Sequence, residues 1–312
     1  MFERVDLSAE PAHLPPSLAA AIEADGGLWY ASDFDTDSAS VVARAREVKA
    51  VALRLAFRDL SLLEKLPEVR YLHLRSDGRP RLEPVAALTK LRALILSVSA
   101  LRGELDVPGF PQLRWLRASL GGKGGKALQD SLAHGHACLE HLSFTEVPAR
   151  TLAELVGGFP RLRHLRVHFA DHLRTPGDLA PVAETLRGLD LDITGIRSLD
   201  GIDVLQRLET FRLYGGKVTD VEPLARLPQL RYAELESGPG IASLEPLRGH
   251  PKLRMLALGL IQDGDLSPLE TLPELVAVGR GTRLVGEPAW PDLAELPRDH
   301  SFRVEFRRAV YG

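Results

Sequence analysis

A short apolar pattern recurs along most of the 312-residue chain. In each occurrence apolar residues fill the first, fourth and sixth positions, as at Leu186, Leu189 and Leu191. Successive occurrences are 21 to 26 residues apart, and they begin at Val48, Val69, Leu91, Leu113, Leu139, Leu162, Leu186, Leu208, Leu230, Leu253 and Leu275. Such repeats predict a solenoid, because one unit alone cannot bury its apolar face whereas stacked units can.

The fourth and sixth positions of each repeat predict a short strand. Both side chains point to the same face of such a strand, and stacked strands form a parallel sheet over a continuous core. The segments that return to the next strand carry proline beside apolar residues, at Pro84, Pro181, Pro223, Pro246 and Pro268. Proline suits the first position of a helical turn, because a backbone N–H at that position would have no acceptor within the helix. The chain is therefore predicted to be an α/β solenoid.

This pattern resembles the leucine-rich repeat family over about residues 48–285. The resemblance implies a right-handed β–α superhelix with the parallel sheet on its concave face. The return segments are similar to those of internalins and of the leucine-rich regulatory subunit of protein phosphatase 1. The repeat that begins at Leu113 is longer, with a predicted helix over 126–133, and is more similar to the ribonuclease-inhibitor class.

One departure from the family pattern concerns the ninth position of each repeat. The family usually has asparagine there, whose amide binds backbone groups of neighbouring turns. This sequence contains no asparagine, and its ninth positions include Ala170, Thr194 and Gly216. We therefore expect the turn after each strand to be less uniform than in the family.

The chain is predicted to have three parts. Residues 1–47 carry nine acidic side chains and three arginines, and their pattern predicts a helix over 17–24, a strand over 28–34 and a second helix from Ser38. We expect this segment to cap the first repeat of an array of about eleven units over 48–285. Residues 286–312 are predicted to form a C-terminal cap, because the alternation at 300–310 is typical of a closing strand.

Composition excludes several classes of protein. Lys and Arg number 39 against 42 Asp and Glu, so no overall basic excess favours nucleic acid. A single cysteine, Cys138, excludes an internal disulfide framework. We see no secretory leader and no long apolar run, and therefore expect a monomeric cytoplasmic protein with no membrane contact. The bias towards Ala, Leu, Arg, Gly and Pro is compatible with a GC-rich bacterial genome.

Three short motifs could carry chemistry, and each has a simpler interpretation. The loop at 121–127 lacks the first Gly and the final Ser or Thr of a phosphate-binding loop, so it is read as a flexible entry into the predicted helix. The acids at 33, 35 and 37 lack the later ligands of a calcium loop and are expected to cap the next helix. The last motif has metal-ligand spacing but spans a connection and a strand, and it comprises His134, His136, Cys138 and His141.

The third, fifth and seventh positions of each repeat are expected to face solvent on the concave sheet face. Over the middle repeats they are rich in Trp, Tyr and Arg, the residue types that dominate binding hot spots. We therefore predict a non-enzymatic module, without cofactor or metal, that binds a protein or peptide on this face. The predicted contact residues are Trp115, Arg117, His141, His164, Arg166, His168, Asp190, Asp192, Arg212, Tyr214, Tyr232, Glu234 and Glu236.

Two alternatives stay open at this point. The fifth positions alternate in sign from Arg166 through Asp190 and Arg212 to Glu234, so they could pair with one another rather than with a partner. The second alternative is a metal-dependent protein or hydrolase, and its cluster would be His141, His164, His168, Asp190 and Asp192.

Overall fold

The computed structural model describes most of the chain. The described residues are 2–5, 16–34, 36–76, 80–98 and 102–280. The predicted C-terminal cap, 286–312, lies outside them. The chain forms two compact units, residues 1–146 with 158–161 and residues 147–157 with 162–312. Each unit is described by itself below.

The first unit is a stack of strands joined by short helices. In chain order its elements are β1 (Phe2–Val5), α1 (Pro16–Ala24), β2 (Leu28–Ser32), α2 (Ser38–Glu47), β3 (Ala52–Ala56), η1 (Ser61–Lys65), β4 (Tyr71–Ser76), η2 (Glu83–Ala87), β5 (Ala93–Val98), η3 (Val107–Gly109), β6 (Trp115–Ser119), α3 (Gly122–Leu132) and β7 (His141–Thr145). Strand β1 pairs antiparallel with β2, and β2 to β7 pair in parallel in sequence order.

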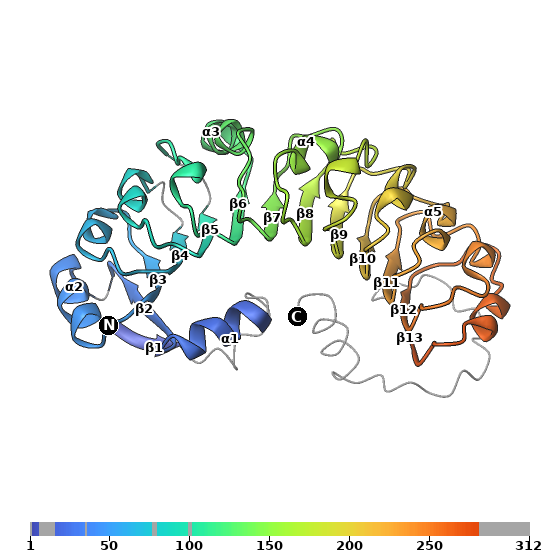
Figure 1. Ribbon diagram of the computed structural model, residues 1–312, viewed down its shortest axis with the longest axis horizontal. Coiled ribbons are helices and arrows are strands. Elements are labelled where there is room, and N and C mark those ends of the chain that lie inside the picture. Colours follow the sequence, from blue (N-terminus) through green and yellow to red (C-terminus); the bar gives the residue numbers. More distant parts are fainter. Residues whose placement is uncertain (1, 6–15, 35, 77–79, 99–101, 281–312) are drawn as a thin grey trace. The chain divides into compact units, whose positions relative to one another are not determined.

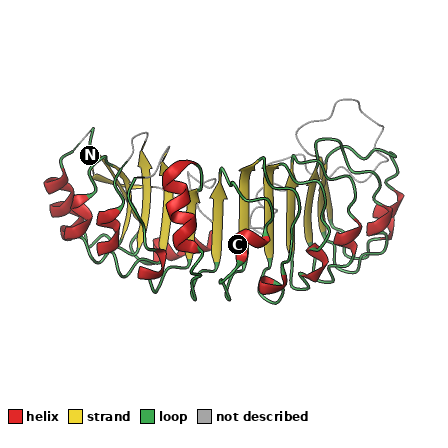
Figure 2. Ribbon diagram, turned by 90° about the horizontal axis from the view of Figure 1, so that it is seen from above, coloured by secondary structure: helices red, strands yellow, loops and turns green. Residues whose placement is uncertain are grey.

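The second unit repeats the same design with shorter helices. Its elements are α4 (Ala153–Val156), β8 (His164–Ala170), η4 (Ala180–Val182), β9 (Gly188–Thr194), η5 (Ile202–Val204), β10 (Thr210–Tyr214), α5 (Glu222–Ala225), β11 (Tyr232–Glu236), η6 (Glu245–Leu247), β12 (Met255–Leu258), η7 (Ser267–Thr271) and β13 (Ala277–Arg280). All its strands pair in parallel with their sequence neighbours. Figure 2 shows the strands (yellow) side by side and the shortness of most helices (red).

The predicted α/β solenoid is confirmed by these two stacks. Leu186, Leu189 and Leu191, at the first, fourth and sixth positions of one repeat, are at most 1% exposed. The same positions of the neighbouring repeats pair in register, as Leu189 does with Leu165 and Phe211. The proline-containing turns form as predicted, with proline at the first or second position of η2, η4, α5, η6 and η7.

A recurrent backbone contact joins each repeat to the next. In the second unit the Arg163 carbonyl accepts hydrogen bonds from the N–H groups of Arg187 and Gly188, at 2.7 and 2.9 Å. The Arg187 carbonyl accepts in the same way from Glu209 and Thr210, at 2.8 and 2.9 Å. These bonds hold the repeats in register whatever side chain the second position carries.

The helix, strand and second helix expected in residues 1–47 are present, together with β1, which was not predicted. The helix over 17–24 is α1, the strand is β2, and the second helix is α2. Asp37 caps α2, because its side chain accepts hydrogen bonds from the Ser40 N–H at 2.9 Å and the Ser40 hydroxyl at 2.6 Å. These bonds to the carboxylate lower the pKa of Asp37.

The position of α1 could not be predicted from the repeat pattern. Within the first unit, α2 and α3 lie on one side of the strands and α1 lies on the other (Figure 1). Leu18 and Ile22 are one helical turn apart, so both point to the same side of α1. They are buried in a cluster with Tyr71 and Ile95, whose positions in the repeat place them on the concave face. The helix therefore lies against that face.

The glycine-rich segment at 121–127 is not the flexible entry that its composition predicts. Helix α3 already begins at Gly122 and includes Gly124 and Gly125. A Cβ at Gly125 would lie 2.2 Å from the backbone carbon of Leu120. Close approach to the preceding strand end is therefore the reason for glycine at this position.

The ninth positions lack the asparagine contacts of the family. Ala170 is completely buried, and the buried hydroxyl of Thr194 has no hydrogen-bond partner among the described residues. The second unit thus fills these positions mainly with small side chains. No described helix is long and apolar enough to cross a membrane.

Candidate functional site on the concave face

The thirteen predicted contact residues are divided between the two units. Trp115, Arg117 and His141 lie in the first unit, on β6 and β7. The other ten lie on four adjacent strands of the second unit, β8 to β11. The term concave face is kept below for the sheet face that carries positions three, five and seven.

In the first unit the expectation that these positions face solvent is wrong for several of them, although the seventh positions Arg75 and Ser97 are exposed. Tyr71, His73, Ala93 and Ile95 are all less than 9% exposed. Helix α1 accounts for much of this burial, because Leu18 and Ile22 pack against Tyr71, Ala93 and Ile95. Small side chains make room for the helix at two of the covered positions, Ala52 and Ala93.

Trp115 takes part in this packing. It is partly buried against the α1 cluster, and its ring stacks on that of His141 with centroids 5.4 Å apart. Its indole nitrogen is buried without a hydrogen-bond partner among the described residues. Trp115 therefore contributes to the fold of the first unit, and it is a poor probe of partner binding.

The second unit carries an ion-pair network on β8, β9 and β10. Arg166 on β8 contacts Asp190 at 3.3 Å and Asp192 at 3.1 Å. Arg212 on β10 contacts the same two carboxylates, at 3.3 and 3.2 Å. The Nε2 atom of His168 lies 3.7 Å from Asp192. The two aspartates are thus enclosed between cationic groups of the strands on either side.

The network continues to β11 through Arg212. Its Nε donates a hydrogen bond of 2.8 Å to the Glu234 carboxylate. The strand register places Arg212 opposite both Asp190 and Glu234, as the alternating fifth positions indicate. Burial raises the pKa of Glu234, although the nearby Arg212 acts in the opposite direction.

The expectation that Asp190 and Asp192 face solvent is also wrong. Asp190 and Asp192 are 3% and 6% exposed, so neither offers a free carboxylate to a partner. Tyr214, Tyr232, Glu234 and the two arginines, in contrast, are half-buried. The accessible part of this face therefore consists of aromatic rings and the outer edges of the ion-pair network.

His164 lies over a glycine of the neighbouring strand. A Cβ at Gly188 would be 2.5 Å from His164 Nδ1 and 2.9 Å from the hydroxyl of Thr210. Burial, and then the positive charges of Arg163 and Arg187, lower the pKa of His164 to about 4. Its imidazole is consequently neutral at pH 7.

The structure does not assemble the alternative metal or hydrolase cluster. Asp190 and Asp192 are engaged by Arg166 and Arg212, and His164 lies over Gly188. Among the residues described, no group of three or more His, Cys, Asp or Glu side chains could hold a metal ion.

One histidine of the motif His134, His136, Cys138 and His141 has a structural role that the spacing did not reveal. The Nδ1 atom of His136 accepts from the Cys138 N–H at 3.2 Å, and its Nε2 lies 2.9 Å from the Phe110 carbonyl of the preceding repeat. His250 repeats this arrangement in the second unit, with Nε2 3.0 Å from the Leu227 carbonyl. Each imidazole therefore links two consecutive repeats. The common signal is a histidine three residues before the first leucine of a repeat.

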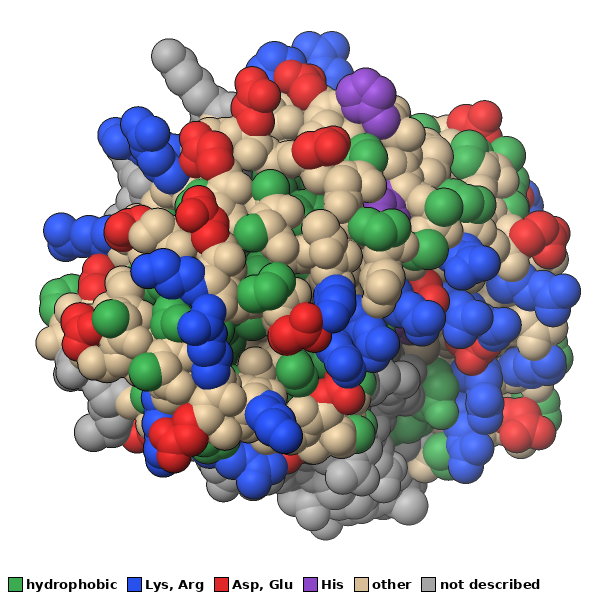
Figure 3. Space-filling model, turned by 60° about the vertical axis from the view of Figure 1, so that its left-hand side comes forward, with side chains coloured by type: hydrophobic (Ala, Val, Ile, Leu, Met, Phe, Trp, Pro, Cys, Tyr) green, Lys and Arg blue, Asp and Glu red, His purple; other side chains and the backbone are tan. Residues whose placement is uncertain are grey.

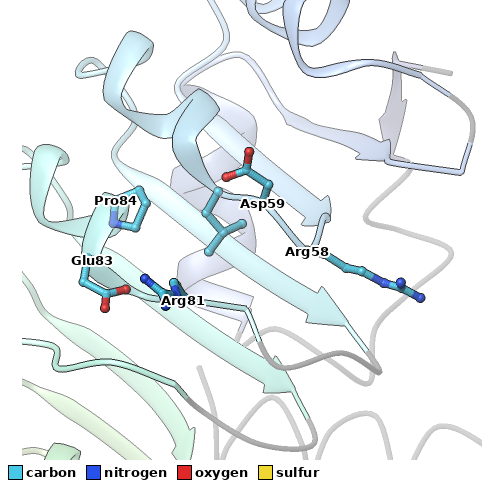
Figure 4. Close-up of a pocket in the computed structure, with 6 residues that line it drawn as sticks. Arg58, Asp59, Arg81, Glu83 and Pro84 are labelled. Carbon is cyan, nitrogen blue, oxygen red and sulfur yellow. The ribbon is translucent and has the colours of Figure 1, made fainter.

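One surface pocket lies away from the predicted contact residues. It has a volume of about 470 Å³ and is lined by Arg58, Asp59, Leu60, Arg81, Glu83 and Pro84. In Figure 4 the side chain of Arg58 points away from the other lining residues. Asp59 is engaged locally, because its carboxylate accepts from the Ser61 N–H at 2.9 Å. The lining thus has charges of both signs and no convergent set of catalytic groups.

Charges of both signs also cover the face that Figure 3 shows. Lys and Arg side chains gather towards the right of the view, and acidic side chains lie beside them over much of the surface. This mixed surface agrees with the small net charge of −3.

The chain was compared with known proteins. No family model matches it, and no curated protein does. Its fold is similar to that of a leucine-rich repeat protein from Leptospira interrogans, with a TM-score of 0.50 and 14% identity over 75% of this chain and 68% of that one. Two internalins from Listeria monocytogenes are also similar. The first, InlF, has a TM-score of 0.41 and 17% identity over 70% of this chain and 83% of that one. The second, internalin C2, has a TM-score of 0.44 and 20% identity over 70% of this chain and 84% of that one. At these identities the likeness concerns the fold alone.

Proposed function

We propose that this chain, which has the leucine-rich repeat fold, is a non-enzymatic module that binds a protein or peptide on the concave face of its second unit. The observation that carries the proposal is the juxtaposition of Tyr214 and Tyr232 with Arg212 and Glu234 on adjacent strands. Half-buried aromatic rings beside charged groups are typical of binding hot spots, because the ring offers apolar area and the charges give orientation.

The ion-pair network supports this role by making the face rigid. Arg212 is held by three carboxylates, and its guanidinium carbon lies 5.4 Å from the centroid of the Tyr214 ring. Side chains that are already ordered lose less conformational entropy when a partner binds. Pairing of these charges with one another is therefore compatible with recognition, because it orders the side chains beside the tyrosines before a partner binds.

The concave face of the first unit is less open to a partner. Its concave face is occupied in part by α1, whose Leu18 and Ile22 cover positions that a partner would need. We therefore leave the predicted contacts Trp115, Arg117 and His141 out of the proposed site and test the second unit first.

The experiment is capture from a lysate of the source cell by the immobilised full chain. Tyr214→Ala and Tyr232→Ala should each reduce the recovery of specifically bound protein about tenfold or more, the effect of removing a hot-spot ring. Glu222→Ala and Glu245→Ala, on α5 and η6, are the matched controls and should leave recovery unchanged. All four variants should melt within a few degrees of the parent chain. Recovery that depends on the controls and not on the tyrosines would refute the proposal.

A further inference from the structure

The eighth position has an unusual backbone conformation in three repeats of the second unit. Phe169, Ile193 and Gly215 occupy it in three consecutive repeats, with φ angles of 53°, 50° and 77°. This left-handed region suits glycine but is unfavourable for other residues, and for β-branched ones above all. Gly215 shows that the turn can be made without a side chain.

The side chains at two of these positions are large, apolar and exposed. Phe169 is 50% exposed and Ile193 is 39% exposed. Packing in the core therefore does not explain them, and the turn itself is better served by glycine. In the repeat that begins at Leu139 the same position carries Glu146, also at a φ of 53°, so a polar residue is compatible with this conformation. Phe169 and Ile193 thus destabilise the folded protein in two ways. Their backbone conformation is unfavourable, and their apolar side chains are exposed to water.

These two residues form one surface feature, which we call the apolar ridge. The register pairs His168 with Asp192 and Ala170 with Thr194, so Phe169 and Ile193 lie side by side at the carboxyl ends of β8 and β9. The ring of Phe169 stacks on His168 with centroids 3.8 Å apart. Because His168 also approaches Asp192, the ridge is continuous with the ion-pair network.

The surface beside the ridge has an acidic excess. On β8 to β11 the charged residues at positions three, five and seven are two arginines and four carboxylates, which leaves a formal charge of −2 with histidine neutral. The arginines are Arg166 and Arg212, and the carboxylates are Asp190, Asp192, Glu234 and Glu236. A partner that covers the ridge and extends over this face would be favoured by positive charge.

We propose that the apolar ridge is the docking site for a protein segment that carries an apolar side chain next to arginine or lysine. The apolar side chain covers Phe169 and Ile193, and the cation lies over the half-buried carboxylates of Glu234 and Glu236 on β11. This inference rests on the proposed function and names the chemistry of its partner. The two unfavourable features of the ridge in the free protein are offset when the segment binds and removes the apolar surface from water.

The test uses the full chain as bait for a phage-displayed library of random dodecapeptides. Selection should enrich peptides with an apolar residue next to Arg or Lys. The variants Phe169→Gly and Ile193→Gly should each weaken binding of the enriched peptides at least tenfold. Since glycine is favoured at this backbone conformation, both variants should melt at or above the temperature of the parent chain.

The outcomes separate this inference from the function on which it rests. Enriched peptides whose binding requires Tyr214 and Tyr232 but not the ridge would leave the recognition function in place and overturn the docking site. Acidic consensus peptides, or no enrichment, would overturn the partner chemistry. A fall of several degrees in the melting temperature of the glycine variants would show that the ridge serves the fold. A concentration-dependent dimer that Ile193→Gly abolishes would assign the ridge to a second copy of the chain.

Discussion

The phenol of Tyr71 donates a hydrogen bond of 2.9 Å to Asp25, the residue that follows helix α1. Tyr71 lies on β4, on the concave face, and 45 residues of chain separate the two positions. Arg70 adds an ion pair with the same carboxylate at 3.4 Å. Burial and this hydrogen bond raise the pKa of Tyr71, so the phenol stays protonated and remains the donor at neutral pH. The contact fastens the end of α1 to the sheet.

Tyr71→Phe should lower the free energy of unfolding by about 1 kcal/mol, because it removes this hydrogen bond and keeps the ring. Urea unfolding followed by circular dichroism measures the change. Tyr30→Phe, on β2, is the control, and it should have a smaller effect. Equal stability of Tyr71→Phe and the parent chain would show that the bond to Asp25 is exchanged for one to water without cost.

Deletion of residues 1–47 should cause aggregation. It would remove β2, which pairs with the edge of β3, its neighbour β1, and α1, which covers Tyr71 and Ile95. An exposed strand edge next to an exposed apolar surface favours association between chains. Light scattering of the purified truncation measures this. A monodisperse truncation with unchanged melting would contradict the proposal that the segment caps the array.

Thr194→Val should raise the free energy of unfolding by roughly 1 kcal/mol. The hydroxyl of Thr194 is buried and has no hydrogen-bond partner in the described part of the chain, so replacing it by a methyl group of similar size removes a desolvation cost. Thr210→Val is the matched comparison, because the Thr210 hydroxyl can donate to the Arg187 carbonyl at 3.5 Å. Urea unfolding should show a gain for the first variant and none for the second.

Arg212→Ala should destabilise the chain by about 3 kcal/mol, since it leaves buried carboxylates without one of their cations. Asp190 and Asp192 would keep Arg166, but Glu234 would lose the guanidinium that binds it at 2.8 Å. Arg226→Ala is the control: Arg226 also pairs with two carboxylates, but its side chain is 59% exposed. The control should change stability by no more than about 1 kcal/mol. A similar loss of unfolding free energy in both variants would contradict the claim that burial makes the ion pairs of Arg212 more important than those of Arg226.

Acidification should destabilise the chain through His164. Its pKa is about 4 in the folded protein, below the ordinary value of 6.5, so the unfolded chain binds more protons between these two values. The contribution is complete above about pH 6.5 and is lost as the pH falls towards 4, by up to about 3 kcal/mol. Burial lowers the pKa of His250 and adds loss of the same sign, whereas the raised pKa of Glu234 offsets part of it.

Urea unfolding at pH 7.5 and pH 5 tests this dependence. His164→Gln removes the titrating group, so the difference in stability between the two pH values should shrink. The exposed residue His172, changed to Gln, should leave the difference as it is in the parent chain. If His164→Gln and the parent chain lose the same stability on acidification, the effect has another origin.

From the second repeat onwards, the sequence by itself determined the strand register and most residues of the core. The prediction for the first repeat was wrong by two residues, because Leu53 and Leu55, and not Val51 and Leu53, pair with the fourth and sixth positions of the next repeat. Leu189 could be placed in the core because the period of the pattern and the alternation within a strand are local properties of the chain. The same reasoning placed Asp190 opposite Arg166 and Arg212, since parallel strands of equal repeats meet position by position.

Only the tertiary structure decided which of the concave positions are accessible. Leu18 and Ile22 lie far from Tyr71 and Ile95 in sequence, and no periodicity relates them, so the packing of α1 on the sheet depends on how two distant surfaces fit. Likewise, the burial of Asp190 follows from side chains of neighbouring strands that fold over it, and the left-handed backbone at Ile193 follows from the turn its repeat must make. Exposure and backbone strain are properties of the assembled repeats, because they arise from contacts that a single repeat does not contain.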